Sequence, residues 1–182
     1  TYAFSYCQYL QKIEIPESVN CLGKEAFYPC KRVETIVFNA ADYTCYADDY
    51  YAPEYRVFDG RNVTELIIGD GVKKIYEGTF CNFEKITELT IPDSVTEIED
   101  FAFYTCPKLE KLILSKNLHT IGDSAFYDCL SLKELDLPES LQVIEEYAFD
   151  CCKSLNELVL PESIQSIGYY AFGGGAFTTL TF

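Results

Sequence analysis

Residues 148–170 read AFDCCKSLNELVLPESIQSIGYY, and the same pattern recurs along most of the chain. An Ala–Phe dipeptide, degenerate to Thr–Phe at 79, begins a copy at residues 3, 26, 79, 102, 125, 148 and 171. The starts from 79 onward are 23 residues apart, as are the first two. A fixed period of this length predicts a repeat architecture in which stacked units share one core.

One interval is longer than the others. The 53 residues between the starts at 26 and 79 exceed two periods by seven. We expect a hidden copy that begins at Arg56, preceded by an expanded copy over 26–55. The apolar residues of that hidden copy are Val63, Leu66, Ile68, Val72 and Ile75. The sequence therefore predicts a single array over 1–182, with about eight repeats that are incomplete at the ends.

Within each copy, two apolar residues two positions apart predict a strand with one buried face. Proline ends this strand in four copies, since it has no N–H to donate to a ladder. The Ala–Phe segment is too short for a full helix and predicts a single turn or a 3₁₀ piece. Stacked copies would pair these strands in parallel at about 4.8 Å per copy. The phenylalanines would then form the largest buried column: Phe4, Phe27, Phe80, Phe103, Phe126, Phe149 and Phe172.

The unit resembles the BspA-like, or Treponema-type, leucine-rich repeat, whose motif reads L-x-x-I-x-I-P-x-S-V-x-x-I-G-x-x-A-F-x-x-C. The resemblance implies an α/β-type leucine-rich-repeat solenoid. It would be a right-handed superhelix with a parallel β-sheet on the concave face and short turns or 3₁₀ pieces on the convex face. It also implies a secreted or surface protein of a host-associated microbe, active in adhesion, with no catalytic motif. The departures fall at residues 39–78, where Asn39, Gly69, Arg56 and Gly60 replace the usual Pro, Ala and Cys.

The charge balance narrows the class of partner. The chain has 14 Lys and Arg against 29 Asp and Glu, a net charge of −15. Such a surface repels phosphate backbones and anionic lipids, so we expect no nucleic-acid partner. The apolar runs are only a few residues long, such as Leu66 to Ile68, so we expect no membrane insertion. Because the sequence starts at Thr1 without Met and stops inside a repeat, we read the chain as part of a longer protein, and the resemblance implies that this protein is extracellular or at the cell surface.

Five of the nine cysteines share one column: Cys7, Cys30, Cys106, Cys129 and Cys152. Phenylalanine or glycine takes this slot elsewhere, so we expect a small buried apolar residue there. No close Cys-x-x-Cys pair is present, and we therefore predict no metal and no cofactor. Cys21 and Cys45 lie off this column and are the pair to test for a disulfide.

Few residues point to catalysis. His119 is the single histidine and lies in a turn, while Ser115 only replaces a proline of the motif. The acidic residues Asp42, Asp48, Asp49 and Asp59 cluster in or beside the expanded copy, where their oxygens could hold calcium, but they lack the spacing of a calcium loop and fit solvated charge better. We predict no catalytic residue and no metal ligand.

The outward positions of the strands form the first candidate binding surface. One column is largely acidic, and the next holds aliphatic residues that a strand would point at solvent. These candidates are Glu65, Ile67, Glu88, Thr90, Lys111, Ile113, Glu134, Asp136, Glu157 and Val159. Exposed apolar residues beside charge favour protein binding, although β-propensity alone would also place them there.

The expanded copy is the alternative binding surface, because recognition concentrates in loops and tyrosine offers contact area with a polar tip. Its candidates are Tyr43, Tyr46, Asp48, Asp49, Tyr50, Tyr51 and Tyr55. The same residues would also fit a loop that folds onto the outer face.

Three functions remain open. The first is a non-catalytic binding or adhesion module, monomeric, with a host or matrix protein or a glycan as partner. The second is a structural stalk that presents other domains, and the third is a hydrolase that depends on His119.

Overall fold

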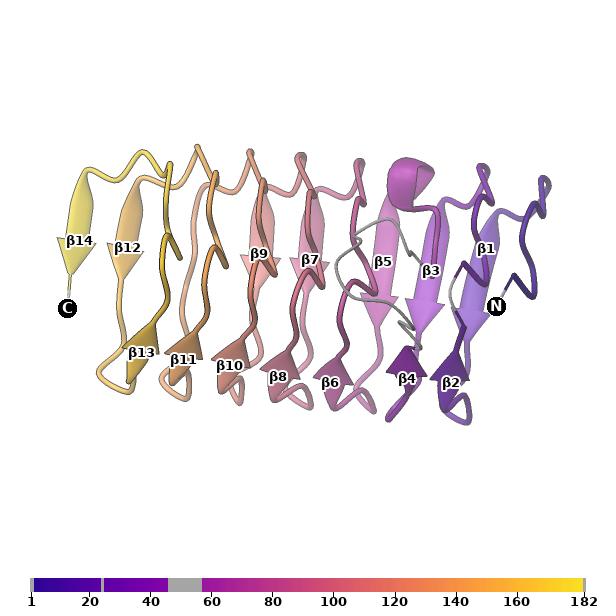
Figure 1. Ribbon diagram of the computed structural model, residues 1–182, viewed down its shortest axis with the longest axis horizontal. Helices are drawn as coiled ribbons and strands as arrows, with labels where there is room; N and C mark the ends of the chain where they lie inside the picture. The colour runs from indigo at the N-terminus through magenta and orange to yellow at the C-terminus, as the bar shows by residue number, and fades with distance from the viewer. Residues whose placement is uncertain (1, 24, 46–56, 182) are drawn as a thin grey trace.

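The computed structural model describes residues 2–23, 25–45 and 57–181. The chain coils into a parallel β-solenoid in which the strands of each turn pair with those of the next turn (Figure 1). The two ends of the chain lie at opposite ends of the long axis (Figure 1). Within the described residues the only helix is the 3₁₀ turn η1 (Gly60–Asn62), so the helical part of an α/β repeat is nearly absent.

The predicted strands form one side of the coil. These long strands are β1 (Lys12–Ile15), β3 (Thr35–Phe38), β5 (Glu65–Ile68), β7 (Glu88–Thr90), β9 (Lys111–Ile113), β12 (Glu157–Val159) and β14 (Thr179–Thr181). Equivalent residues pair directly, as Ile13 with Ile36 and Ile36 with Leu66. Burial alternates along β1 and β5, which confirms the two-residue period predicted from the sequence.

A second set of strands, which the sequence analysis did not predict, runs along another side of the coil. It consists of β6 (Lys74–Ile75), β8 (Glu97–Ile98), β10 (Thr120–Ile121), β11 (Val143–Ile144) and β13 (Ser166–Ile167), with β2 (Cys21–Leu22) and β4 (Thr44–Cys45) as a separate pair. Each strand has only two residues, which is too short to show an alternating pattern. Figure 1 shows these short strands along the lower edge of the solenoid.

The Ala–Phe segments form a third ladder of hydrogen bonds between turns. The N–H of Phe103 donates to the carbonyl of Ala125 at 2.8 Å, and the N–H groups of Phe101 and Thr105 donate in the same way, each at 2.8 Å, to Asp123 and Tyr127. The expected single turn is found in these segments, where the Tyr104 N–H donates to the carbonyl of Phe101 at 3.1 Å. The alternative, a 3₁₀ piece, is absent from them because every second donor bonds to the next turn.

Residues two positions before and after the phenylalanine have left-handed backbone conformations. They are Tyr2, Tyr6, Glu25, Asn82, Phe101, Thr105, Ser124, Asp128, Tyr147, Cys151 and Tyr170, with Gly78 and Gly174 at equivalent places. Their φ angles direct alternate N–H groups along the solenoid axis. Because non-glycine residues are strained in this region, the ladder is formed at a local conformational cost.

The phenylalanine column is continuous. Ring centroids of successive turns lie 5.1 Å apart for Phe4 and Phe27, and 5.2 Å apart both for Phe103 and Phe126 and for Phe126 and Phe149. The hidden copy contributes Phe58, which stacks between Phe27 and Phe80 at 5.5 and 6.1 Å. The predicted contact between phenylalanines of neighbouring turns is confirmed.

The register of the hidden copy differs from the prediction by one residue at its start. Val57 accepts the hydrogen bond from the Phe27 N–H, as alanine does in other turns, so Val57 and Phe58 occupy the Ala–Phe slots. A start at Arg56 is therefore wrong. Phe58 lies 31 residues after Phe27 and 22 before Phe80, so the expanded copy has eight extra residues and the hidden copy is shorter by one.

The cysteine column is a core column, as predicted. Cys30, Cys106, Cys129 and Cys152 are buried and Cys7 is partly buried. Burial raises the pKa of the Cys129 thiol well above its ordinary value, which makes this thiol a poor nucleophile. At the hidden copy glycine takes this slot because the ring of Phe83 fills the space, and a Cβ on Gly60 would collide with that ring.

Phe126→Ala should lower the free energy of unfolding by about 3–5 kcal/mol, because it leaves a cavity between two stacked rings. Denaturation in urea measures this loss. Phe4→Ala is the matched control, since Phe4 is 55% exposed and stacks on one ring only. An equal loss for the two variants would contradict the stacked core.

Thr105→Gly should stabilise the chain by up to about 1 kcal/mol, because Thr105 has a φ of 58° that a β-branched residue adopts at a cost. Thr87→Gly is the control. Thr87 is an exposed residue outside the left-handed set, and there glycine should destabilise. A lower melting temperature for Thr105→Gly than for the parent chain would contradict the strain.

Candidate binding surfaces

The outward side of the long strands is exposed except at β3, where Thr35 and Val37 are half-buried, and it is called the long-strand face here. All ten strand positions singled out in the sequence are exposed: Glu65, Ile67, Glu88, Thr90, Lys111, Ile113, Glu134, Asp136, Glu157 and Val159. The alternation of the strands places them there, because their neighbours in sequence point into the core. Glu134 and Asp136 lie between β9 and β12, where an isolated bridge joins Lys111 to Glu134.

Parallel register converts single residues into columns on this face. Glu88 pairs with Lys111 and Thr90 with Ile113, so from β5 to β12 one column is charged at each turn and the next alternates aliphatic residues with Thr90 and Asp136. The aliphatic side chains are unusually exposed for their type: Ile67 by 44%, Ile113 by 47% and Val159 by 62%. The long-strand face therefore offers apolar contact area beside carboxylates.

The N-terminal part of this face contains one internal ion pair and one hydrogen bond to a carboxylate. Lys12 forms an ion pair with Glu14 at 3.3 Å, and the Thr35 hydroxyl donates to Glu65 at 3.1 Å. Farther along, no ion pair within the described residues joins Glu134, Asp136 or Glu157 to a cation. The two ends of the face thus differ in electrostatic character although their patterns in sequence are alike.

Tyr43, predicted as a recognition residue of the expanded copy, is instead fully buried. Its hydroxyl lies 2.7 Å from the Thr79 hydroxyl, and its ring packs edge-on against Phe38 and Tyr76 at 4.8 and 4.7 Å. Because the side chain is enclosed, it cannot contact a partner. Its function is to anchor the start of the expansion to the core.

The other candidates of the expansion, Tyr46, Asp48, Asp49, Tyr50, Tyr51 and Tyr55, lie outside the described residues. Two neighbouring acids are engaged in local contacts. Asp42 accepts a hydrogen bond from the Tyr76 hydroxyl at 2.9 Å, and the buried Asp59 binds Arg61 through both of its oxygens at 2.8 Å. In the described part of the chain, no group of three or more His, Cys, Asp or Glu residues is placed to hold a metal ion.

An acidic groove beside the short strands was missed by the sequence analysis. It has a volume of about 660 Å³ and is lined by Glu77, Glu97, Ile98, Glu99, Asp100, Thr120, Gly122, Asp123, Glu145 and Glu146. Lys74 neutralises part of it by pairing with Glu97 at 3.0 Å and Glu99 at 2.6 Å. The signal was present in the sequence as an acid at every twenty-third position, in Glu77, Asp100, Asp123 and Glu146.

Two carboxyl groups of this groove, those of Glu77 and Asp100, have raised pKa values. Burial, followed by the charges of Asp100 and Glu99, raises the pKa of Glu77 above its ordinary 4.5. Burial together with the charges of Asp123 and Glu99 raises the pKa of Asp100 above 3.8, although Asp100 also accepts a hydrogen bond from the Asp123 N–H. Ionisation of both groups therefore costs more in the folded chain than in the unfolded chain.

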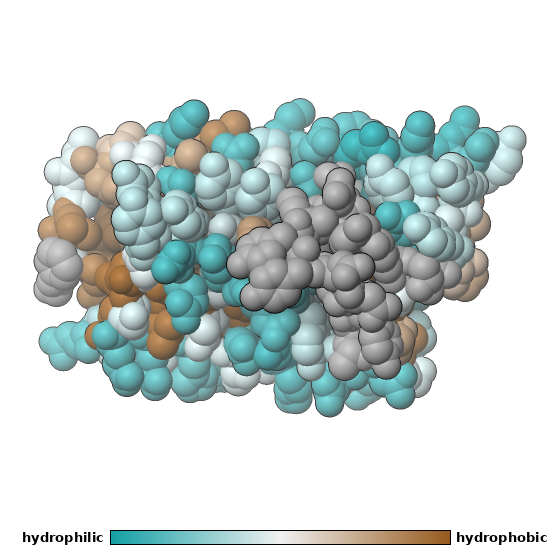
Figure 2. All heavy atoms as spheres, in the orientation of Figure 1, coloured by the Kyte–Doolittle hydropathy of each residue, from teal (hydrophilic) through white to brown (hydrophobic). Residues whose placement is uncertain are grey.

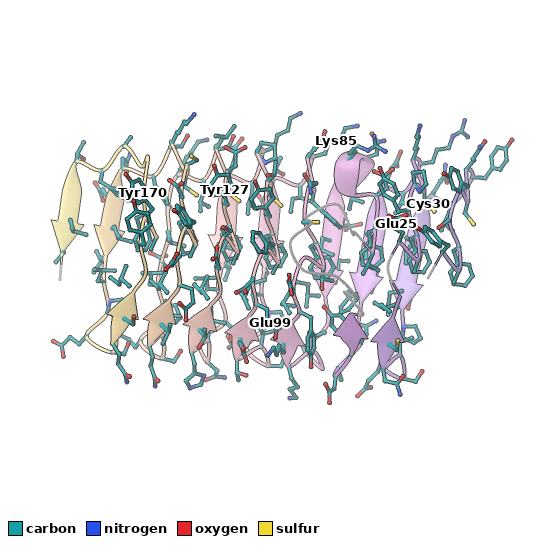
Figure 3. All side chains as sticks on the ribbon, viewed as in Figure 1. Glu25, Cys30, Lys85, Glu99, Tyr127 and Tyr170 are labelled. Atoms are coloured by element: carbon teal, nitrogen blue, oxygen red, sulfur yellow. The ribbon has the colours of Figure 1, made fainter. Side chains whose placement is uncertain are left out.

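Aromatic residues gather on the face formed by the Ala–Phe segments. Tyr104 and Tyr127 stack at 5.0 Å, and Tyr147 stacks on Tyr170 at 5.9 Å. Figure 3 shows Tyr127 and Tyr170 on the same side of the solenoid, with Glu99 near the short strands. A hydrogen bond with the Cys151 thiol raises the pKa of Tyr127 to about 12, so this phenol stays protonated.

The surface is uneven in polarity. Figure 2 shows hydrophobic side chains toward the C-terminal end and hydrophilic side chains along the edge of the short strands.

His119 is exposed, and Ser115 near it in sequence is buried. Within the described residues, no helix has the length and hydrophobicity that crossing a bilayer requires.

Comparison with known proteins identifies the family of the repeat. A family model for the BspA type leucine rich repeat region matches residues 1–50 and 54–178 in six copies. No match was found among curated proteins.

Solved structures share the fold. A leucine-rich repeat protein of Treponema pallidum is 34% identical over 60% of this chain and 51% of its own, with a TM-score of 0.59. One from Bacteroides ovatus is 24% identical over 93% of this chain and 53% of its own, with a TM-score of 0.60. A leucine rich cell surface protein of Faecalibacterium prausnitzii is 20% identical over all of this chain and 62% of its own, with a TM-score of 0.59. The present chain thus spans between about half and two thirds of these structures.

The raised pKa values in the groove predict that stability depends on pH. With Glu77→Gln and Asp100→Asn combined, the chain should be more stable than the parent at neutral pH, where the parent holds both carboxylates ionised at a cost. As pH falls through the raised pKa values, the folded parent takes up protons more readily than the unfolded chain, and the advantage should shrink. Urea denaturation at a series of pH values measures the difference. A difference that stays constant between pH 7 and the ordinary pKa values would refute this account.

Proposed function

This chain belongs to the BspA-type leucine-rich repeat family, and from that premise we propose that it is a non-catalytic module that binds a protein partner through its long-strand face. The observation that carries the proposal is the exposure of aliphatic residues beside carboxylates along paired strands. In this proposal the coil is a right-handed superhelix, the long-strand face is its concave side, and the protein acts in adhesion at the cell surface or outside the cell.

The physical basis of the proposal is that inward and outward residues of each turn have different roles. Inward residues maintain the shared core, so outward residues are free to vary without unfolding the array. Exposed isoleucine and valine favour burial against a partner, while the adjacent carboxylates set which partner is accepted. A host or matrix protein fits this surface better than a neutral glycan, because a glycan offers no charge to the acidic column.

A structural stalk is the second candidate. The continuous core and the separation of the two chain ends along the long axis would suit a spacer (Figure 1). A stalk requires no ligand on the long-strand face. Capture of a partner by the whole protein but never by this array would favour the stalk.

Glu65, Glu88 and Glu134, each changed to Lys, should together abolish binding to whichever protein the chain captures from an immobilised panel of host and matrix proteins. The reason is that three charges on the long-strand face are reversed. Surface plasmon resonance against the captured protein gives the affinity, and the melting temperature verifies that the variant is folded.

The matched control reverses the exposed Glu17, Glu139 and Glu162, which follow prolines outside the long strands. It changes net charge equally and should keep binding. Unchanged affinity in the first variant would remove the long-strand face from the proposal.

A further inference from the structure

Five residues near the C-terminal end of the long-strand face combine exposed aliphatic area with carboxylates, and they are called the C-terminal patch. They are Ile113, Glu134, Asp136, Glu157 and Val159, on three consecutive turns. Neighbouring turns are about 4.8 Å apart, so a single extended segment of a partner can contact all three turns.

The carboxylates of the patch lack cationic partners within the described residues. The nearby Lys133 is committed to Glu110, with its Nζ 2.6 Å from the carboxylate. Lys111 lies opposite Glu134 in register, yet forms no ion pair with it. The patch therefore carries uncompensated negative charge, unlike the N-terminal part of the same face, where Lys12 pairs with Glu14.

The exposed aliphatic residues of the patch set a second, independent requirement for the chemistry of the partner. Val159 is 62% exposed and Ile113 is 47% exposed, on either side of the turn that carries Asp136. A partner that covers them must bring apolar side chains. A partner that also covers the carboxylates must bring cations, since burying an unpaired carboxylate costs several kcal/mol.

We propose that the partner of the long-strand face is a basic polypeptide segment in which lysine or arginine alternates with apolar residues, and that it docks on the C-terminal patch. This inference rests on the proposed function, because it names the chemistry of the partner for the same surface. An acidic polypeptide would meet like charge there, and a neutral glycan would leave the carboxylates without cations.

The test uses short synthetic peptides as probes and fluorescence anisotropy to measure affinity. A peptide of alternating lysine and leucine should bind, with an affinity that falls as salt is added. Replacing its leucines with serine should weaken binding, and replacing its lysines with glutamate should abolish it. Binding of the glutamate–leucine peptide as strongly as the lysine–leucine peptide would overturn the inference.

Substitutions locate the site. Glu134→Gln, Asp136→Asn and Glu157→Gln together should weaken binding of the lysine–leucine peptide by roughly tenfold, the sum expected for three surface charge pairs. Ile113→Thr with Val159→Thr should weaken it without changing the salt dependence. The control triple Glu17→Gln, Glu139→Gln and Glu162→Gln removes equal charge from outside the long-strand face and should leave affinity nearly unchanged.

Equal losses for the two triple variants would show diffuse attraction to an acidic chain and would overturn the inference. The outcomes also separate this inference from the proposed function. If the lysine variant of Glu65, Glu88 and Glu134 loses its captured protein while the peptides show no preference for the patch, only the inference fails. If that variant keeps its captured protein, the proposed function itself fails.

Discussion

Each inner phenylalanine of the central column, from Phe27 to Phe149, is covered by the rings of the turns before and after it, so no inner turn completes its own core. The stacked centroid distances of 5.1 to 6.1 Å along the column show how closely the turns must approach. This requirement holds the strands in register, and it is met even where the interval between phenylalanines changes to 31 and 22 residues around Phe58. It also determines which side chains point outward, and hence the composition of the long-strand face.

The features that could be predicted from the sequence are those that depend on apolar side chains repeating at a constant period. The long strands follow from pairs such as Leu158 and Leu160, and the exposure of Glu157 and Val159 follows from the same alternation. The burial of Cys129 and Cys152 could be inferred because phenylalanine and glycine share their column. The outward residues of the candidate surface were therefore identified correctly as exposed, although sequence alone does not say which of them lack ionic partners.

The features that could not be predicted depend on backbone geometry or on contacts across turns. The left-handed conformations fall on Thr105, Asp128 and Tyr147, whose side chains share no property that marks them. Counting residues in steps of 23 placed the start of the hidden copy at Arg56. Val57 and Phe58 occupy the Ala–Phe slots instead, because the ring of Phe58 stacks on that of Phe27. Tyr43 was expected at a recognition surface because it lies in a tyrosine-rich expansion, yet its hydroxyl has a buried partner in the Thr79 hydroxyl, which offsets the cost of burying a phenol.

The central claim is that stacking between adjacent turns, and not burial of each ring alone, holds the solenoid together. A double-mutant cycle on Phe103 and Phe126, whose rings stack at 5.2 Å, measures it most directly. Their coupling energy should be about 0.5–1.5 kcal/mol, the value for aromatic pairs in contact. Phe103 and Phe149, two turns apart, should show a coupling near zero. Equal coupling in the two cycles, or none in either, would contradict the account.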